Sequence, residues 1–415
     1  MKKFLLIRRH IDGLVFLFAA FMFLLPTEAS AIVFGIFLSI GIYLLIFRPK
    51  KSLSRLDKTY VLVTLGFSAS SLLINLLNGS LPEDIRWSSY PLYYLLVIPI
   101  VIGATLVRDP LRQLVIGTRA ALVVLALWGL AETILAPGRL GFGSNPANAA
   151  FSLTFLAIIS RLTVSSPPWL LANRYIFFYL GFITVIASQT RAVLPVFLFG
   201  MAIDAVRLLF KRNSGWRFGS RHNILASGLA LAFCIGSIWV IYPSYADRIQ
   251  SSIKEISNVL QPSEPDSGTA ASGLAIRLGQ WQAAVSVIAE NPLLGRGGTG
   301  ISEAIIEHSE QALNVDMTQF TFVHNFILDE AIQRGLVGLT LLLGYFGFCF
   351  WRIYRHGDSS MKENVLLILV LTFSFGLLHY LLVIDRHVIL YALYFLLLTT
   401  ANRGWRPLYA PKLVA

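Results

Sequence analysis

Three side chains that lie far apart in the 415-residue chain, Arg191, Arg277 and His324, have types suited to one kind of group transfer. A guanidinium is always charged and presents a planar fork to phosphate oxygens, so two arginines brought together would suit a diphosphate. An unperturbed imidazole has a pKa of about 6.5 and can accept a proton at neutral pH. Each residue also has a structural interpretation: Arg191 could extend to water, Arg277 could stack on Trp281 or pair with an acid, and His324 could serve the fold at a helix boundary.

Two further polar segments are candidates for supporting roles. Asp385, in the turn Asp385-Arg386-His387, could orient a base, hold an arginine or form a structural ion pair. Arg296 lies in the sequence GRGGTG at 295–300, which has the GxGxxG spacing of dinucleotide-binding loops, although no strand precedes it within a βαβ unit. We interpret this segment as a tight turn rather than a nucleotide site, with an anion site of backbone amides as the alternative. The seven histidines show no HExxH or paired-ligand spacing, so we expect neither a metal nor a cofactor.

The composition indicates the scaffold that must position these residues. The chain is 56% hydrophobic and only 13% charged, with a mean hydropathy of +0.68, whereas soluble domains are about 25% charged. Helix-length apolar runs recur along it, which predicts an all-α polytopic membrane protein. Twelve transmembrane helices are predicted, at 11–25, 31–47, 60–77, 90–107, 114–135, 149–163, 175–188, 192–210, 224–241, 326–351, 364–382 and 387–400.

The basic residues predict the orientation of these helices. With the N-terminus inside, 25 of the 34 lysines and arginines fall in inner connections, as the positive-inside rule requires. Both termini are therefore predicted to be cytoplasmic, with Arg191, Arg277, His324 and Asp385 on the outer side. The net charge of +12 is spread over these inner connections, so it indicates contact with anionic membrane lipids and not with nucleic acid.

The predicted organisation has three parts: helices 1–9 at 1–241, one large periplasmic loop at 242–325, and helices 10–12 with a cytoplasmic tail at 326–415. Apolar periodicity predicts that the loop is partly helical, with helices at 245–260, 275–290 and 301–313. One side of the second of these helices is predicted to carry Arg277, Trp281, Ala284, Val285 and Ile288.

Two features of the apolar segments have structural interpretations. The sequence Ala29-Ser30-Ala31 imitates a signal-peptide cleavage site, but Arg8, Arg9 and Asp12 interrupt the preceding run. We therefore expect the first helix to remain uncleaved. The two cysteines lie in apolar spans and are expected to be small core residues.

Taken together, the motifs resemble the O-antigen ligase and polymerase superfamily of bacterial inner membranes. Three segments carry the resemblance: the turn SQTRA at 188–192, RLGQWQAAVSVIAENPLLGRGGTG at 277–300, and HNFILDEAIQRGLVGL at 324–339. These motifs cover about a tenth of the chain, and the number of spans and the position of the loop extend the match. The resemblance implies a GT-C-like glycosyltransferase architecture and an active site facing the periplasm.

The resemblance implies transfer of a glycan from undecaprenyl diphosphate to a sugar hydroxyl, with inversion and without metal, nucleotide or cofactor. In the ligase branch, which the motifs favour, the acceptor is lipid A-core and the product is complete lipopolysaccharide. His324 corresponds to the family's essential histidine, and Arg191 and Arg277 to its essential arginines, whereas Trp281, Asp385 and Arg296 are candidates for supporting roles. The alternatives are an O-antigen polymerase of the same superfamily and, from another class, a secondary transporter, for which ionisable residues near the middle of the membrane are expected.

Overall fold

The computed structural model describes residues 28–54, 56–80, 90–105, 107, 109–135, 138–165, 167, 171–210, 250, 273–297, 323–382 and 384–401. Its regular secondary structure within these ranges is entirely helical. The longer elements are α2 (Glu28–Phe47), α4 (Lys58–Leu77), α6 (Tyr90–Ala104), α7 (Pro110–Leu135), α8 (Pro146–Ser160), α9 (Arg174–Ala187), α10 (Leu194–Phe210), α12 (Gly273–Glu290), α14 (Phe326–His356), α15 (Ser359–Gly376) and α16 (Asp385–Ala401). Two short helices are α3 (Pro49–Leu53) and the 3₁₀ helix η2 (Arg191–Val193).

Ten of the twelve predicted spans coincide with helices, with ends that differ by only a few residues. Within the described part of the chain, α4, α7 and α14 are long and apolar enough to cross a membrane. The loop helix predicted at 275–290 is α12. The predicted spans at 11–25 and 224–241, and the loop helices predicted at 245–260 and 301–313, lie outside the described residues apart from position 250.

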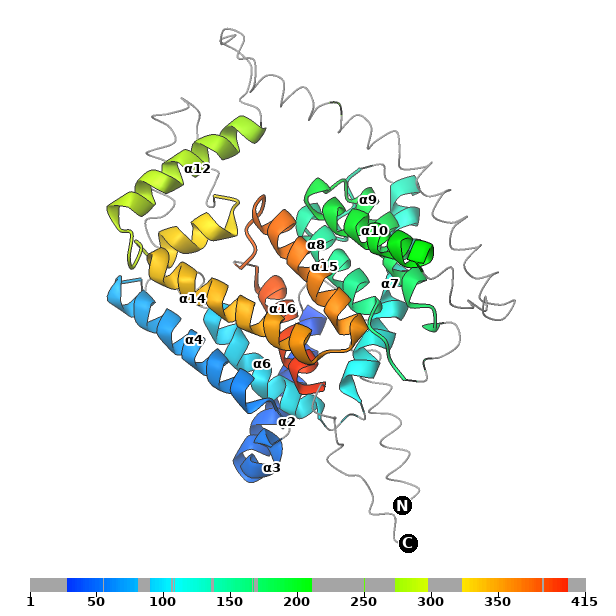
Figure 1. The fold of residues 1–415 in the computed structure, drawn as a ribbon, viewed down its shortest axis with the longest axis horizontal. Helices are drawn as coiled ribbons and strands as arrows, with labels where there is room; N and C mark the ends of the chain where they lie inside the picture. The colour runs from blue at the N-terminus through cyan, green and yellow to red at the C-terminus, as the bar shows by residue number, and fades with distance from the viewer. Residues whose placement is uncertain are drawn as a thin grey trace, which may run out of the picture.

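The last three helices join two groups of earlier helices (Figure 1). One group contains α2, α4 and α6, and the other contains α7, α8, α9 and α10. Helix α14 packs on α4, α15 packs on α8 and α10, and α16 packs on both α6 and α8. Helices α14, α15 and α16 therefore form the centre of the fold, and most of their contacts are made by buried aromatic and aliphatic side chains.

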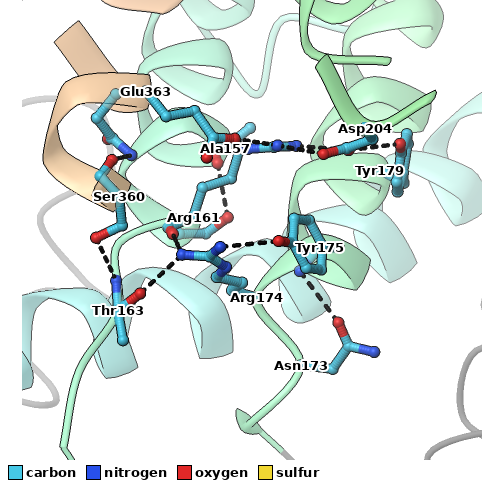
Figure 2. Close-up of polar contacts among 12 residues, drawn as sticks. Ala157, Arg161, Thr163, Asn173, Arg174, Tyr175, Tyr179, Asp204, Ser360 and Glu363 are labelled. Atoms are coloured by element: carbon cyan, nitrogen blue, oxygen red, sulfur yellow. Dashed lines mark hydrogen bonds and ion pairs between the residues drawn. The ribbon is translucent and has the colours of Figure 1, made fainter. Parts of the chain in front are cut away.

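One end of the bundle is held by a buried ion-pair network centred on Arg161 (Figure 2). Arg161 is fully buried and contacts Glu363 of α15, and its guanidinium donates to Asp204 of α10 at 2.6 and 2.9 Å. Tyr179 of α9 donates its hydroxyl to Asp204 at 2.9 Å. Charges buried in this way are stable only when they are paired and hydrogen-bonded, and removal of one partner costs about 3–5 kcal/mol. The network thus fixes α15 against α8, α9 and α10 at the end where the sequence places inner connections.

At the opposite end, α14 is interrupted at Gly335, whose φ of 66° and ψ of −170° are not helical. A continuous helix would join Leu336 N to Ile332 O and Val337 N to Gln333 O. The segment 291–297, which we call the strap, replaces both bonds with four. Within it, Arg296 N and Gly297 N donate to Ile332 O and Gln333 O at 2.8 and 3.1 Å, and Pro292 O and Leu293 O accept from Leu336 N and Val337 N at 2.8 and 3.2 Å.

The strap fits so closely that three glycines are needed. A Cβ atom at Gly335 would lie 2.2 Å from Leu293 O, and one at Gly295 would lie 2.5 Å from Ile332 O. Gly297, with a φ of 78°, meets Ser80 at the end of α4. Asn78 completes the contact by donating its side-chain amide to Leu294 O at 3.1 Å and Gln333 O at 2.9 Å. The end of α4, the strap and the broken part of α14 are therefore a single hydrogen-bonded unit.

We predict that Gly335→Ala disrupts this unit. A methyl group at position 335 would be strained at positive φ and would push the strap from α14, at a cost of about 2–5 kcal/mol in backbone strain and lost hydrogen bonds. Gly344→Ala is the matched control, because a Cβ atom at Gly344, in the same helix, would meet nothing within 4 Å. When thermal unfolding of the detergent-solubilised variants is monitored by size-exclusion chromatography, the unfolding temperature should fall markedly for Gly335→Ala and not for Gly344→Ala. Equal unfolding temperatures for the two variants would contradict the conclusion that the strap stabilises the broken part of α14.

Candidate functional site

His324 lies just before α14, in a backbone conformation that the neighbouring residues hold in place. Its φ is 58°, in the left-handed region that non-glycine residues rarely adopt. Both backbone polar groups of the preceding residue, Val323, are hydrogen-bonded. Trp281 Nε1 donates to Val323 O at 3.1 Å, and Val323 N donates to the Asp329 carboxylate at 3.1 Å. After His324, Asn325 caps α14 by accepting from Ile327 N at 3.1 Å. The backbone on both sides of His324 is therefore held by α12 and α14 together.

Helix α12 carries Arg277 and Trp281 and packs against the start of α14. Its buried contacts are Ala283, Ala284 and Val287, which form a small apolar cluster with Val323 and Ile332. Val285, which was predicted on the same side of the helix as Ala284, is 59% exposed, so the buried face covers only part of the predicted side. The buried face follows the spacing 280, 283, 284 and 287, and Trp281 and Ile288 lie at its edge.

His379, in the connection between α15 and α16, lies near two of the predicted site residues, His324 and Arg277. Its ring lies 6.3 Å from that of His324, between centroids, and stacks on Phe375 at 4.6 Å. Burial lowers the pKa of His379 to about 3, and the largest further contribution is the positive charge of Arg277, followed by His324, His387 and Arg139. Arg277 and His324, 47 positions apart in sequence, therefore act on one neutral imidazole.

Arg191 begins the 3₁₀ helix η2, which packs against α15 and α8. The turn before it is sharp: Gln189 has a φ of 55°, and Thr190 N donates to Ser188 Oγ at 3.3 Å. This turn is held to the connection between α7 and α8, where Leu140 N donates to Ala187 O at 3.1 Å. Arg191 thus lies at the end of α15 that leads to His379, and not at the Arg161 end.

Three residues of this region were not predicted as site residues: Arg139, His379 and Tyr380. The ring of Tyr380 lies edge-on to His324 at 5.3 Å, and Arg139 Nε donates to Ser188 O at 3.4 Å. A polar residue at the outer end of an apolar run is a weak sequence signal, and this signal applies to all three. Only the packing of α15 against η2 and α14 shows that they are neighbours of the predicted residues.

The other supporting candidates have different surroundings. Asp385 is exposed at the start of α16, and its carboxylate lies near the Tyr93 hydroxyl of α6. Arg296 pairs with Glu290 at 2.7 Å, and both side chains are about 40% exposed. The amides of Gly295, Arg296 and Gly297 are bonded to carbonyl oxygens, so the prediction of a tight turn is confirmed here and these amides do not line an anion site. Residues 298–300 lie outside the described ranges.

This arrangement supplies a proton acceptor beside fixed positive charge. His324 is half-buried, and Arg277 and Arg139 are permanent cations near the neighbouring ring of His379. Such a site suits an anionic leaving group and a nucleophile that must lose a proton. Among the residues that the structure describes, no three histidine, cysteine, aspartate or glutamate side chains form a group that could hold a metal ion.

One comparison with known proteins gives a family match for the middle of the chain. A family model described as O-antigen ligase matches residues 176–343, a range that contains Arg191, Arg277, Trp281, Arg296 and His324. Arg139, His379 and Asp385 lie outside this match. The search among curated proteins gives no significant match. The matched range includes η2, α12, the strap and the first half of α14, the elements that build the site, and it supports membership of the chain in the O-antigen ligase and polymerase superfamily.

Proposed function

We propose that the protein is an O-antigen ligase at the periplasmic face of the bacterial inner membrane. It transfers a glycan from undecaprenyl diphosphate to a sugar hydroxyl of lipid A-core, which completes lipopolysaccharide. The observation that carries the proposal is the position of His324 and Arg277 around His379, because it brings a proton acceptor and a phosphate-binding group to one end of the bundle. The family match over 176–343 is consistent with it.

In this mechanism His324 is the general base. It takes the proton of the acceptor hydroxyl as the oxygen attacks the anomeric carbon, while the bond from that carbon to the diphosphate oxygen breaks. A single displacement of this kind inverts the anomeric centre. Undecaprenyl diphosphate leaves with the bonding electron pair, and Arg191 and Arg277 stabilise its growing negative charge, which is the larger part of the task. The reaction balances without a metal or a cofactor.

The neighbouring groups prepare His324 for this role. Trp281 and Asp329 hold the carbonyl oxygen and the amide of Val323, so the backbone that carries His324 is ordered before the reaction. Because Trp281 lies one helical turn after Arg277, the same hydrogen bond also fixes the distance between the base and one phosphate-binding group.

We predict that His324→Ala lowers the transfer rate about 10²- to 10⁴-fold, the usual contribution of a general base. Arg191→Ala and Arg277→Ala should each lower it about 10²- to 10³-fold, as expected for groups that stabilise charge in the transition state. Arg296→Ala is the control, because its exposed pair with Glu290 contributes about 1 kcal/mol or less. Purified variants are assayed with lipid-linked glycan and lipid A-core. Near wild-type transfer by His324→Ala would exclude it as the base.

A finer prediction concerns the hydrogen bond from Trp281 to Val323 O. Trp281→Phe keeps an aromatic ring in the α12–α14 contact but removes the donor, so kcat should fall about 2- to 10-fold, the equivalent of one neutral hydrogen bond. Trp351→Phe serves as the control, since Trp351 is 56% exposed on α14, far from His324 in sequence. If kcat is equal in the two variants, Trp281 contributes packing alone.

The proposed function itself is tested by deleting the gene and examining the lipopolysaccharide of the strain. Loss of the polymer ladder together with accumulation of lipid-linked polymer is the expected result, because the donor then has no route to the core. Core that carries a single repeat unit would instead assign the protein to the polymerases. An unchanged ladder, with solute uptake by the purified protein in vesicles, would support a transporter.

A further inference from the structure

His379 is a histidine of the candidate site to which the proposed mechanism gives no role. It follows α15, in the connection to α16, and lies outside the range that the family model matches. Its ring stacks on Phe375 with 4.6 Å between centroids and an interplanar angle of 23°, so an aromatic side chain covers one face of the imidazole. His324 and His379 are both only partly buried, so a substrate can reach both rings.

The distance between these two rings fits one oxygen atom. The ring centroids of His324 and His379 are 6.3 Å apart, with an interplanar angle of 56°. Because a ring nitrogen lies about 1 Å from the ring centre, a direct hydrogen bond between two imidazoles would bring the centres to about 5 Å. A hydroxyl that donates to one ring and accepts from the other, at about 2.8 Å each, instead holds the centres about 6 to 7 Å apart. The observed separation matches the second case.

His379 can donate to such a hydroxyl without competing for its proton. Burial lowers the pKa of its imidazole to about 3, and so do the positive charges around it, which belong to Arg277, His324, His387 and Arg139. A neutral imidazole carries one N–H donor. At neutral pH His379 therefore offers an N–H group and does not take up a proton, whereas His324 is the proton acceptor of the proposed mechanism. The two histidines have complementary roles toward one hydroxyl.

We propose that His379 is an acceptor-binding residue, whose N–H group donates a hydrogen bond to the sugar hydroxyl that attacks the donor. The proposal rests on the proposed function, because it takes His324 as the base for that hydroxyl. In the reactive complex the hydroxyl lies between the two rings. Its proton passes to His324 and its oxygen forms the new bond to the anomeric carbon, while the bond from that carbon to the diphosphate breaks. His379 keeps its own proton throughout and holds the oxygen in place.

The competing explanation is that His379 only packs on Phe375 at the end of α15. His379→Phe tests this explanation, because phenylalanine keeps an aromatic ring for the stack and removes the N–H group. His379→Gln makes the opposite change, since its amide keeps a donor and loses the ring. The matched control is His387→Phe. His387 also packs on Phe375, at 5.7 Å between centroids, but it is fully buried and cannot contact a substrate.

The experiment measures steady-state glycan transfer by the purified full-length variants while the concentration of the acceptor is varied. For His379→Phe we expect kcat/KM for lipid A-core to fall about 10- to 100-fold, because one hydrogen bond and the orientation that it provides are lost. His379→Gln should stay within about 5-fold of the wild type, since it retains a donor. The KM for the donor should change less than about 3-fold in both variants, and His387→Phe should behave like the wild type.

Three results would overturn the inference. If His379→Phe transfers glycan at the wild-type rate, His379 contributes packing alone. An equal loss for the donor and the acceptor, which His379→Gln does not rescue, would indicate damage to the whole site. A fall in kcat at unchanged acceptor KM, restored by added imidazole, would show that His379 carries the proton itself.

These outcomes differ from a failure of the proposed function. If the wild type transfers glycan to a lipid-linked glycan and not to lipid A-core, the protein is a polymerase, and the same variants are compared with that acceptor, whose hydroxyl would meet the same two rings. If the wild type transfers glycan to neither acceptor, the inference fails together with the proposed function.

Discussion

The site depends on one interruption in α14. Because Gly335 leaves the helical conformation, two backbone hydrogen bonds of α14 are missing and the strap at 291–297 supplies their replacements. The strap is the continuation of α12, so the same bonds that repair α14 also anchor the helix that carries Arg277 and Trp281. Unpaired backbone groups are costly in a membrane, which makes this repair obligatory and the position of α12 nearly fixed.

Two groups of buried charge outside the candidate site consist of opposed pairs. Glu330 and Arg334 pair at 2.7 Å beside the interruption, where Tyr90 donates to the same carboxylate, and Arg161 pairs with Asp204 and Glu363 at the other end. Helix α15 starts beside the Arg161 network, through Glu363, and ends three residues before His379, so it connects that network with the candidate site. Around His379, the positive charges of Arg277 and Arg139 both favour the neutral form of the imidazole.

Much of this could be predicted from sequence, for identifiable reasons. Apolar runs located ten helices, because burial and membrane contact both select apolar residues. The glycines of 295–297 indicated a turn. The bonds between the strap and α14 could not be predicted, because they join backbone atoms far apart in the chain. Arg139 and His379 were missed for a similar reason: each is an ordinary polar residue in its own segment, and only tertiary packing makes it a neighbour of His324 or Arg277.

In the proposed mechanism one site, built by η2, α12 and the start of α14, holds the donor's diphosphate beside His324. A cryo-electron microscopy map of the protein in nanodiscs with undecaprenyl diphosphate would locate the lipid head group. We expect phosphate density within hydrogen-bonding distance of Arg191 and Arg277, with the His324 ring facing the side on which an acceptor would enter. Density at the Arg161 end, or a lipid head group separated from His324 by intact protein, would contradict the proposal.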